Sequence, residues 1–289
     1  MKSTCTLVLS FIILAFAFAA PAAAEKNPWD TPLPFKEATI QYTISGTENG
    51  TETLYIKDHG KERARHRKST AKVMSVTNST DEIEITSPDW IYHLDMTAKT
   101  GTKVTNPLKF MMEEYDQLSA KEKEMVNKNA AEMGASAMKG MQGGIKQNAE
   151  KFMGYDCDVT TMSGTTVHAI HATDITLKAQ FNMMGMNFST VATNIDTSSP
   201  PGKAFTLPAG VQISHDKEAD DMARSMTKST IDTLKSPDGA KKMKEMAPTP
   251  PRQGGYPGAG QPGPDGQMDE ASQQEMEKAM KAMQEMFGK

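Results

Sequence analysis

The chain has 289 residues, a formal net charge of −4 at pH 7, 37% hydrophobic residues and 23 methionines. So mild a negative charge gives no basis for bulk attraction to nucleic acid, which excludes that class of partner. The low aromatic content of 6% favours a small β-rich domain with polar, Met-rich helices over one large core.

Residues 1–24 have the order of a secretory signal peptide. A positive charge at Lys2 precedes an apolar run over residues 7–20, which Pro21 and three alanines follow. The run is shorter than the roughly 20 residues that span a hydrocarbon core, and no later segment is apolar enough. We predict cleavage after Ala24 and a soluble periplasmic protein that does not span a membrane. The processed chain would keep Cys157 alone and could form no internal disulfide.

The first folded segment has the pattern of a β-hairpin. Residues 38–46 and 51–57 each alternate between apolar and polar positions, which is typical of half-buried strands. Asn49-Gly50 between them is a dipeptide that favours a type I′ turn. The apolar positions of the two segments are Ile40, Tyr42, Ile44, Leu54 and Ile56.

An antiparallel meander is predicted to follow. Asp58-His59-Gly60 indicates a second turn. Further strand patterns cover residues 61–68, 73–77, 82–86 and 90–95, and the last of them alternates through Trp90, Tyr92 and Leu94.

The pattern then changes to that of a helical insert over residues 108–153. Ser119 and Glu122 have the spacing of a capping box, in which each side chain satisfies a free backbone donor of the first turn. Apolar residues recur at intervals of four, at Met133, Ala137, Met141 and Ile145, and several glycines weaken this helix.

Strand patterns resume after the insert and give way to polar helices. The strands are predicted at residues 155–162, 165–172, 175–183 and 187–195, with a short one within 205–213. A helical extension is predicted over residues 216–246, a disordered Pro/Gly linker over 247–267 and an amphipathic helix over 268–289. The apolar stripe of this last helix is Met276, Met280, Met283 and Phe287.

The two β blocks resemble the LolA-like superfamily of envelope proteins related to outer-membrane lipoprotein-sorting proteins. The likeness covers about residues 35–213 and is carried by LYIKDHGKERAR, DWIYHLDMTAKTG, GYDCDV and AFTLPAGVQI in that order. It implies an α+β fold in which a half-open antiparallel barrel over residues 35–215 wraps a hydrophobic cavity. It also implies a carrier or sensor of acyl chains, lipoproteins or another apolar ligand.

The methionines allow three interpretations. Met repacks readily around varied ligands, so a Met-lined surface suits adaptable apolar binding, but Met also fills cores, which we favour for Met183 and Met186. Soft thioethers also select Cu(I), and three M-x-x-M pairs occur. No His or Cys lies beside these pairs to complete a site, so no metal ligands are assigned. The pairs are Met138 with Met141, Met243 with Met246, and Met280 with Met283.

Two polar patterns have functional and ordinary interpretations. Arg63, Arg65 and Arg67 share one strand face, where they could meet anionic headgroups or simply form a solvated face. His168 and His171 are three apart in a predicted strand and so point to opposite sides, which favours polar positions on an edge strand over a joint metal site.

The sequence contains no nucleophile elbow, zinc-protease helix, phosphate-binding glycine loop or paired-cysteine frame, so we predict no enzymatic activity and no cofactor. The prediction is a non-enzymatic binding protein whose half-barrel buries an apolar ligand under the helical insert. The alternative is an envelope interaction scaffold whose C-terminal helix docks into a protein partner, and Met-based copper binding is the third. The predicted ligand-binding residues are Ile40, Tyr42, Ile44, Leu54, Ile56, Trp90, Tyr92 and Leu94, with Met133, Met141 and Ile145 from the lid.

Overall fold

The computed structural model describes residues 27–73, 76–140, 144–162, 164–183 and 186–246. By its internal contacts the chain divides into two units, residues 1–244 and 245–289, and the fold below is that of the first. The predicted helix with Met276, Met280, Met283 and Phe287 lies outside the described residues, as do Met141 and the proposed signal peptide. No helix in the described part of the chain is long and apolar enough to cross a membrane.

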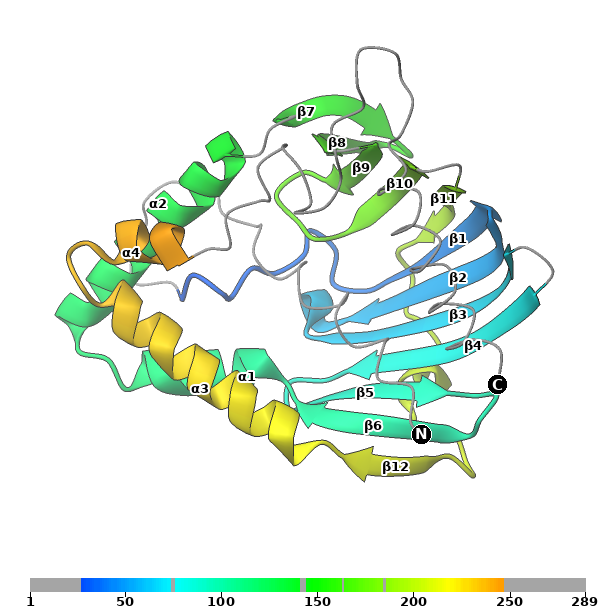
Figure 1. The fold of residues 1–289 in the computed structure, drawn as a ribbon, viewed down its shortest axis with the longest axis horizontal. Helices are drawn as coiled ribbons and strands as arrows, with labels where there is room; N and C mark the ends of the chain where they lie inside the picture. The colour runs from blue at the N-terminus through cyan, green and yellow to red at the C-terminus, as the bar shows by residue number, and fades with distance from the viewer. Residues whose placement is uncertain (1–26, 74–75, 141–143, 163, 184–185, 247–289) are drawn as a thin grey trace, which may run out of the picture. The chain divides into compact units, whose positions relative to one another are not determined.

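The first unit is built on one large open sheet, with a few helices beside it (Figure 1). The order of its 12 strands is β12-β6-β5-β4-β3-β2-β1-β11-β10-β9-β8-β7, and neighbours are antiparallel except for β12 and β6. The predicted α+β class with an open antiparallel sheet is therefore confirmed. The strands are β1 (Ala38–Gly46), β2 (Glu48–Lys57), β3 (Glu62–Val73), β4 (Val76–Thr86), β5 (Trp90–Asp95), β6 (Thr100–Thr105), β7 (Ile145–Phe152), β8 (Tyr155–Met162), β9 (Thr165–Ile170), β10 (Thr176–Met183), β11 (Met186–Asp196) and β12 (Gln212–His215).

One ion pair shows which side of the sheet is concave. The Arg63 guanidinium on β3 reaches the Asp174 carboxylate, which lies in the turn between β9 and β10, with N–O distances of 2.5 and 3.1 Å. Three strands separate β3 from β10 in the sheet, and in a flat sheet that order would place them about 19 Å apart. The sheet must therefore curl toward the side that carries Arg63, which we call the concave side.

The main apolar core lies on this concave side. It joins residues of β1 and β2 to residues of β8, β9 and β10, and two side chains of the N-terminal segment, Leu33 and Phe35, complete it. Leu33, Phe35, Ala38, Ile40, Tyr42, Ile56, Cys157, Ile170, Ile175, Leu177 and Ala192 are its buried members.

On the opposite side of the sheet, the chain between β11 and β12 passes behind the strands in Figure 1 and covers part of β2 and β3. A short 3-10 helix in it, η3 (Gly202–Phe205), contacts β3. The Phe205 ring meets Tyr55 edge-on at 6.5 Å, and the backbone oxygen of Ala204 lies 3.3 Å from Nε2 of His66. Strand register places three further residues on this side, and all three are buried: Ala64, Ile85 and Leu94.

The helices form a second core of their own. α1 (Pro107–Asp116) and α2 (Ala120–Gly140) pack against α3 (Lys217–Leu234), followed by α4 (Gly239–Met246). The predicted capping box is confirmed, because Ser119 and Glu122 exchange hydrogen bonds at the start of α2. Asn106 and Asp216 cap α1 and α3 by accepting from backbone N–H groups. Tyr115, Val126, Ile231 and Leu234 form this core, with Trp29, Met111, Leu118, Met133 and Met243 packed on it.

The predicted helical insert is too long at its C-terminal end. Residues 145–152 are not helical but form β7, paired with β8, so Ile145 is a strand residue opposite Thr160. α2 ends at Gly140, and Gly144, just before β7, adopts a φ of +77°, a left-handed conformation that glycine adopts without strain. The intervals of four that include Ile145 thus cross a helix end and do not describe one face.

The predicted turn at Asn49-Gly50 is also misplaced. Both residues belong to β2, and Gly50 lies opposite Ile44 on β1 and Ser69 on β3. The chain reverses at Gly46 instead, whose φ of +110° a side chain would resist. A Cβ atom at Gly50 would come within 2.1 Å of the Lys68 carbonyl oxygen, so this glycine permits close strand approach.

Asn129 joins α2 to the end of α3. Its side-chain amide is 1% exposed and donates to the carbonyl oxygens of Leu234 and Ser236, both at 2.8 Å. Replacing Asn129 by alanine is expected to lower the free energy of unfolding by about 2 kcal/mol, because two carbonyls would lose their buried donor. Urea unfolding of the variant measures this, and an unchanged midpoint would contradict the proposed role of the bridge.

Candidate ligand-binding face

Strand register places five of the eight ligand-binding residues predicted on the half-barrel strands on the concave side. Ile40 lies opposite Leu54, Leu54 lies opposite Arg65, and Ile56 lies opposite Arg63. Residues opposite each other in a ladder share a face of the sheet. The five predicted residues on this side are Ile40, Tyr42, Ile44, Leu54 and Ile56, and all but the half-buried Leu54 are fully buried.

The other three strand residues of the prediction lie on the opposite side. Arg65 pairs with Glu84 and Glu84 pairs with His93, so His93 and its alternate neighbours, not Tyr92, share the concave side. The prediction that Trp90, Tyr92 and Leu94 share the concave face with Ile40 is therefore wrong. Leu94 is buried on the far side, and the Trp90 ring is engaged there by Lys103 at 4.1 Å and by His215 at 5.3 Å.

The side chain of Met133, in the described part of the predicted lid, does not lie on this face. Met133, on α2, packs into the helical core, where α2 lies against α3. The concave core is covered instead by Leu33 and Phe35, from a segment that sequence patterns did not single out. A Pro-rich segment without periodicity carries no signal for its burial, which explains the omission.

A charged strip runs along the concave side beside the apolar residues. Nη2 of Arg67 lies 2.8 Å from Oε2 of Glu48, and Nη1 lies 3.4 Å from Oε2 of Glu52. The Ser69 hydroxyl donates to Glu48 as well. Arg67 also lies over the Phe188 ring, 5.7 Å from its centroid. The arginine is thus fixed on several sides.

Arg65 has a more open environment in the same strip. Its Nη2 lies 3.1 Å from Oε2 of Glu84, which also lies 3.2 Å from Nδ1 of His93. The side chains of Arg65 and His93 are 42% and 46% exposed. With Arg63 paired to Asp174, all three predicted headgroup arginines already have carboxylate partners, so an anionic group would have to share or exchange them.

These contacts shift the pKa values of the carboxyl groups. Burial acts to raise the pKa of Glu84, but the hydrogen bond from His93 and the charge of Arg65 outweigh it, so the pKa lies below its ordinary value. The pKa of Glu48 is also lowered, because Ser69 and Arg67 outweigh its burial. Burial, with the charges of Glu52 and Asp174, raises the pKa of Tyr42, whose hydroxyl donates to the Thr176 carbonyl at 3.0 Å.

The lowered pKa values predict acid sensitivity. A carboxyl group with a lowered folded-state pKa stabilises the fold above its unfolded value of 4.5, and this stabilisation is lost as the pH falls through the folded-state pKa. We expect the urea concentration at the unfolding midpoint to decrease as the pH is lowered below 4.5. This decrease should be smaller in Glu84→Gln, which cannot titrate at this position. Equal declines in the wild type and the variant would show that Glu84 contributes nothing to it.

Of the methionine pairs, only Met243 with Met246 lies fully within the described residues, and both predicted histidines do. Met243 packs on the helical core, whereas Met246 is 64% exposed. His168 lies on β9, an interior strand, and is buried, so its placement on an edge strand is wrong. Its Nδ1 lies 3.0 Å from Glu150 without hydrogen-bond alignment. Nowhere in the described ranges do three or more His, Cys, Asp or Glu side chains group as metal ligands.

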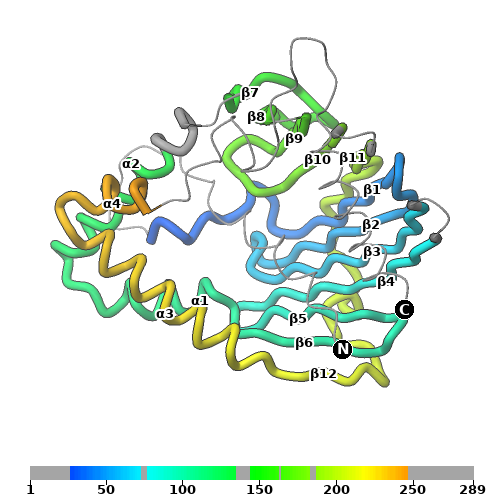
Figure 2. The backbone as a smooth tube through the Cα atoms, viewed as in Figure 1, coloured from blue at the N-terminus to red at the C-terminus, as the bar shows by residue number. Residues whose placement is uncertain are grey.

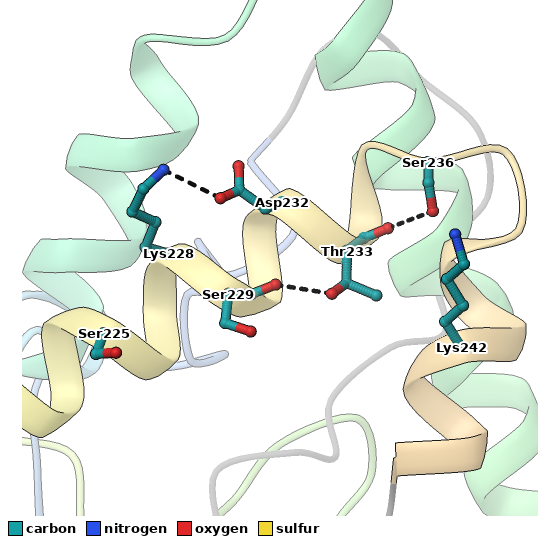
Figure 3. A pocket seen from close by; sticks show the side chains of 7 residues that line it. All are labelled: Ser225, Lys228, Ser229, Asp232, Thr233, Ser236 and Lys242. Carbon is teal, nitrogen blue, oxygen red and sulfur yellow. Dashed lines mark hydrogen bonds and ion pairs between the residues drawn. The ribbon is translucent and has the colours of Figure 1, made fainter.

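A shallow polar hollow lies away from the sheet, along α3 and α4 (Figure 3). Its volume is about 480 Å³, and two of its charged side chains, Lys228 and Asp232, pair at 3.0 Å. Thr233 and Ser236 direct their hydroxyls to backbone carbonyls. None of the predicted ligand-binding residues lines it, so the concave side of the sheet remains the candidate site.

Comparison with known proteins finds only weak structural similarity. No protein-family model and no curated protein matches the chain. An uncharacterized conserved protein from Thermus thermophilus aligns at 8% identity and a TM-score of 0.35, over 62% of this chain and 90% of that one. The protein PNGF-II aligns at 11% identity and a TM-score of 0.33, over 66% of this chain and 32% of its own. Similarity this low carries no argument about fold or function.

Proposed function

We propose that the protein is a non-enzymatic, periplasmic carrier or sensor of amphiphiles, in which the concave side of the sheet binds an acyl chain and its polar headgroup. One observation supports this proposal above the others. The apolar residues of β1 and β2 continue, on the same side of the sheet, into the charged strip of β3, with Leu54 opposite Arg65 and Ile56 opposite Arg63. An amphiphile likewise has an apolar part joined directly to a charged part, so it matches this surface.

The charged strip favours a zwitterionic headgroup. Arg65 and His93 are partly exposed there, and Glu82, opposite Arg67, is an exposed carboxylate on the same side. A phosphate can share the donors of Arg65, while an ammonium group can pair with a carboxylate. Apolar burial would supply affinity at roughly 25 cal/mol per Å² before ordering costs. Membership of the LolA-like superfamily is part of the same proposal.

Binding of palmitoyl lysophosphatidylethanolamine monomers tests the function. Arg65→Gln is expected to weaken binding about tenfold, because one charge-assisted contact to the headgroup is lost. Lys68→Gln is the matched control: it removes one positive charge from the same strand, but three residues away and therefore on the other side of the sheet. Titration calorimetry measures both. Equal affinities of the two variants, or no binding to the wild type, would contradict the proposal.

Two further experiments distinguish the carrier function from the scaffold alternative and from the copper alternative. A chain ending at Ala247 should keep lipid binding if the sheet is the carrier, whereas a scaffold that depends on residues 268–289 should lose its protein partner. Copper binding through thioethers would instead raise thermal stability when Cu(I) is added under reducing conditions.

A further inference from the structure

Residues 27–37, which we call the strap, connect the two cores of the described fold. At one end the Trp29 ring meets Tyr115 of the helical core edge-on at 5.9 Å. At the other end Leu33 and Phe35 are 4% and 8% exposed within the concave core. Figure 2 shows the strap as the dark blue segment that runs from the helices toward β1. It has no helix or strand of its own before β1 begins at Ala38.

The strap is attached to the sheet by a small set of polar contacts at one turn. The Leu33 N–H donates to the His59 carbonyl and the His59 N–H donates to the Lys36 carbonyl, both at 2.9 Å. Nδ1 of His59 lies 3.1 Å from the Leu33 carbonyl oxygen. Pro32 and Pro34 have no N–H to donate. By contrast, Ile40 and Ile56 lie in strands that are paired on both sides.

The strap can therefore leave the concave side without breaking the ladders of the sheet. Leu33 and Phe35 belong to the same core as Ile40 and Ile56. Departure of the strap would therefore expose the apolar surface of Ile40 and Ile56. This surface ends at the charged strip, because Arg63 lies opposite Ile56. An apolar chain is the ligand chemistry that can replace two buried hydrocarbon side chains at such a place.

We propose that Leu33 and Phe35 occupy the acyl-chain subsite, so that the strap is a built-in occupant that a ligand displaces. This inference rests on the proposed function and adds to it the location of the chain and the element that moves. Because the strap competes with the ligand, the apparent affinity is reduced by the fraction of time that the subsite is occluded. Weakening the strap should therefore tighten ligand binding, whereas damage to an ordinary core would weaken it.

Residue-resolved amide hydrogen exchange of the wild-type protein tests the displacement directly. Saturation with palmitoyl lysophosphatidylethanolamine monomers is expected to speed exchange at the Leu33 and His59 amides, while the ladder amides of β1 and β2 stay protected. The variant Leu33→Ser/Phe35→Ser is expected to bind the same lipid about tenfold more tightly, since the occluding side chains no longer favour the apolar subsite. Leu207→Ser, at a residue that is 45% exposed, is the control and should bind as the wild type does.

The outcomes separate this inference from the function on which it rests. Lipid binding to the wild type with unchanged exchange at Leu33 and His59 would overturn the strap proposal and leave the carrier function standing. A folded double variant that binds more weakly than the wild type would overturn it too. Absence of lipid binding by the wild type and the double variant would overturn both proposals. If the double variant does not fold, the exchange of the wild type decides alone.

Discussion

Replacing Ile56 by alanine is expected to lower the free energy of unfolding by about 2–5 kcal/mol. Ile56 is 0% exposed and belongs to the core that joins β1 and β2 to β8, β9, β10 and the strap. Truncation removes buried methyl groups and leaves a cavity between elements that the sheet ladders hold in place, so the site cannot collapse fully. Urea unfolding, followed by circular dichroism, measures the change.

Leu207→Ala is the control for this measurement. It removes hydrocarbon from a side chain that is 45% exposed, so a loss of less than about 1 kcal/mol is expected. A similar loss in the two variants would mean that the concave core contributes no more to stability than an exposed leucine does.

Replacing Arg67 by methionine is expected to cost about 3–5 kcal/mol, because it leaves two carboxylates without their partner. The side chains of Arg67 and Glu48 are each 21% exposed, and that of Glu52 is 12% exposed. Methionine keeps most of the apolar length of the side chain but loses the charge, so the variant removes both ion pairs and the contact of the guanidinium with the Phe188 ring. The pKa of Glu48 should rise, and the variant should gain stability, relative to the wild type, as the pH falls below 4.5.

A second substitution tests whether unpaired charge is the cause. Arg67→Met/Glu48→Gln should recover part of the lost stability, since one of the two uncompensated charges is removed. Lys68→Met provides the control on the other side of β3, because its pair with Asp81 involves a lysine that is 73% exposed and should contribute at most about 1 kcal/mol. Failure of the double variant to recover would assign the cost to packing instead.

Sequence patterns predicted most of the strands but missed β6 and β7, and they placed a separate strand over residues 73–77, where β3 ends and β4 begins. They also could not place the faces of the strands. The alternation of residues 90–95 matches β5, yet it could not show that Trp90 and Ile40 lie on different faces of the sheet. Alternation shows which residues of one strand share a face, but a turn of unknown length does not carry that information to the next strand. The Asn49-Gly50 dipeptide gave the hairpin but not its turn, since Gly50 was needed for close strand approach. Local patterns report local conformation, and the register across several turns depends on the whole sheet.

The candidate site was predictable only where its residues repeat along one strand. Arg63, Arg65 and Arg67 stand out at alternate positions, but their carboxylate partners come from β2, β4 and the turn after β9. Pairing between strands is not visible in the spacing of one strand. The burial of His168 and the omission of the strap have the same cause, because both depend on neighbours far away in the sequence.

The central place of β1 has a consequence for how the protein folds. β1 pairs with β2, which follows it directly, and with β11, where Ile40 lies opposite Ile195, 155 residues later. The hairpins from β1 to β6 and from β7 to β11 are local and can form early, whereas the β1–β11 seam must close a very long loop. Folding is therefore limited by the arrival of β11, and a chain that emerges gradually from its N-terminus exposes one edge of β1 until most of the sequence is available.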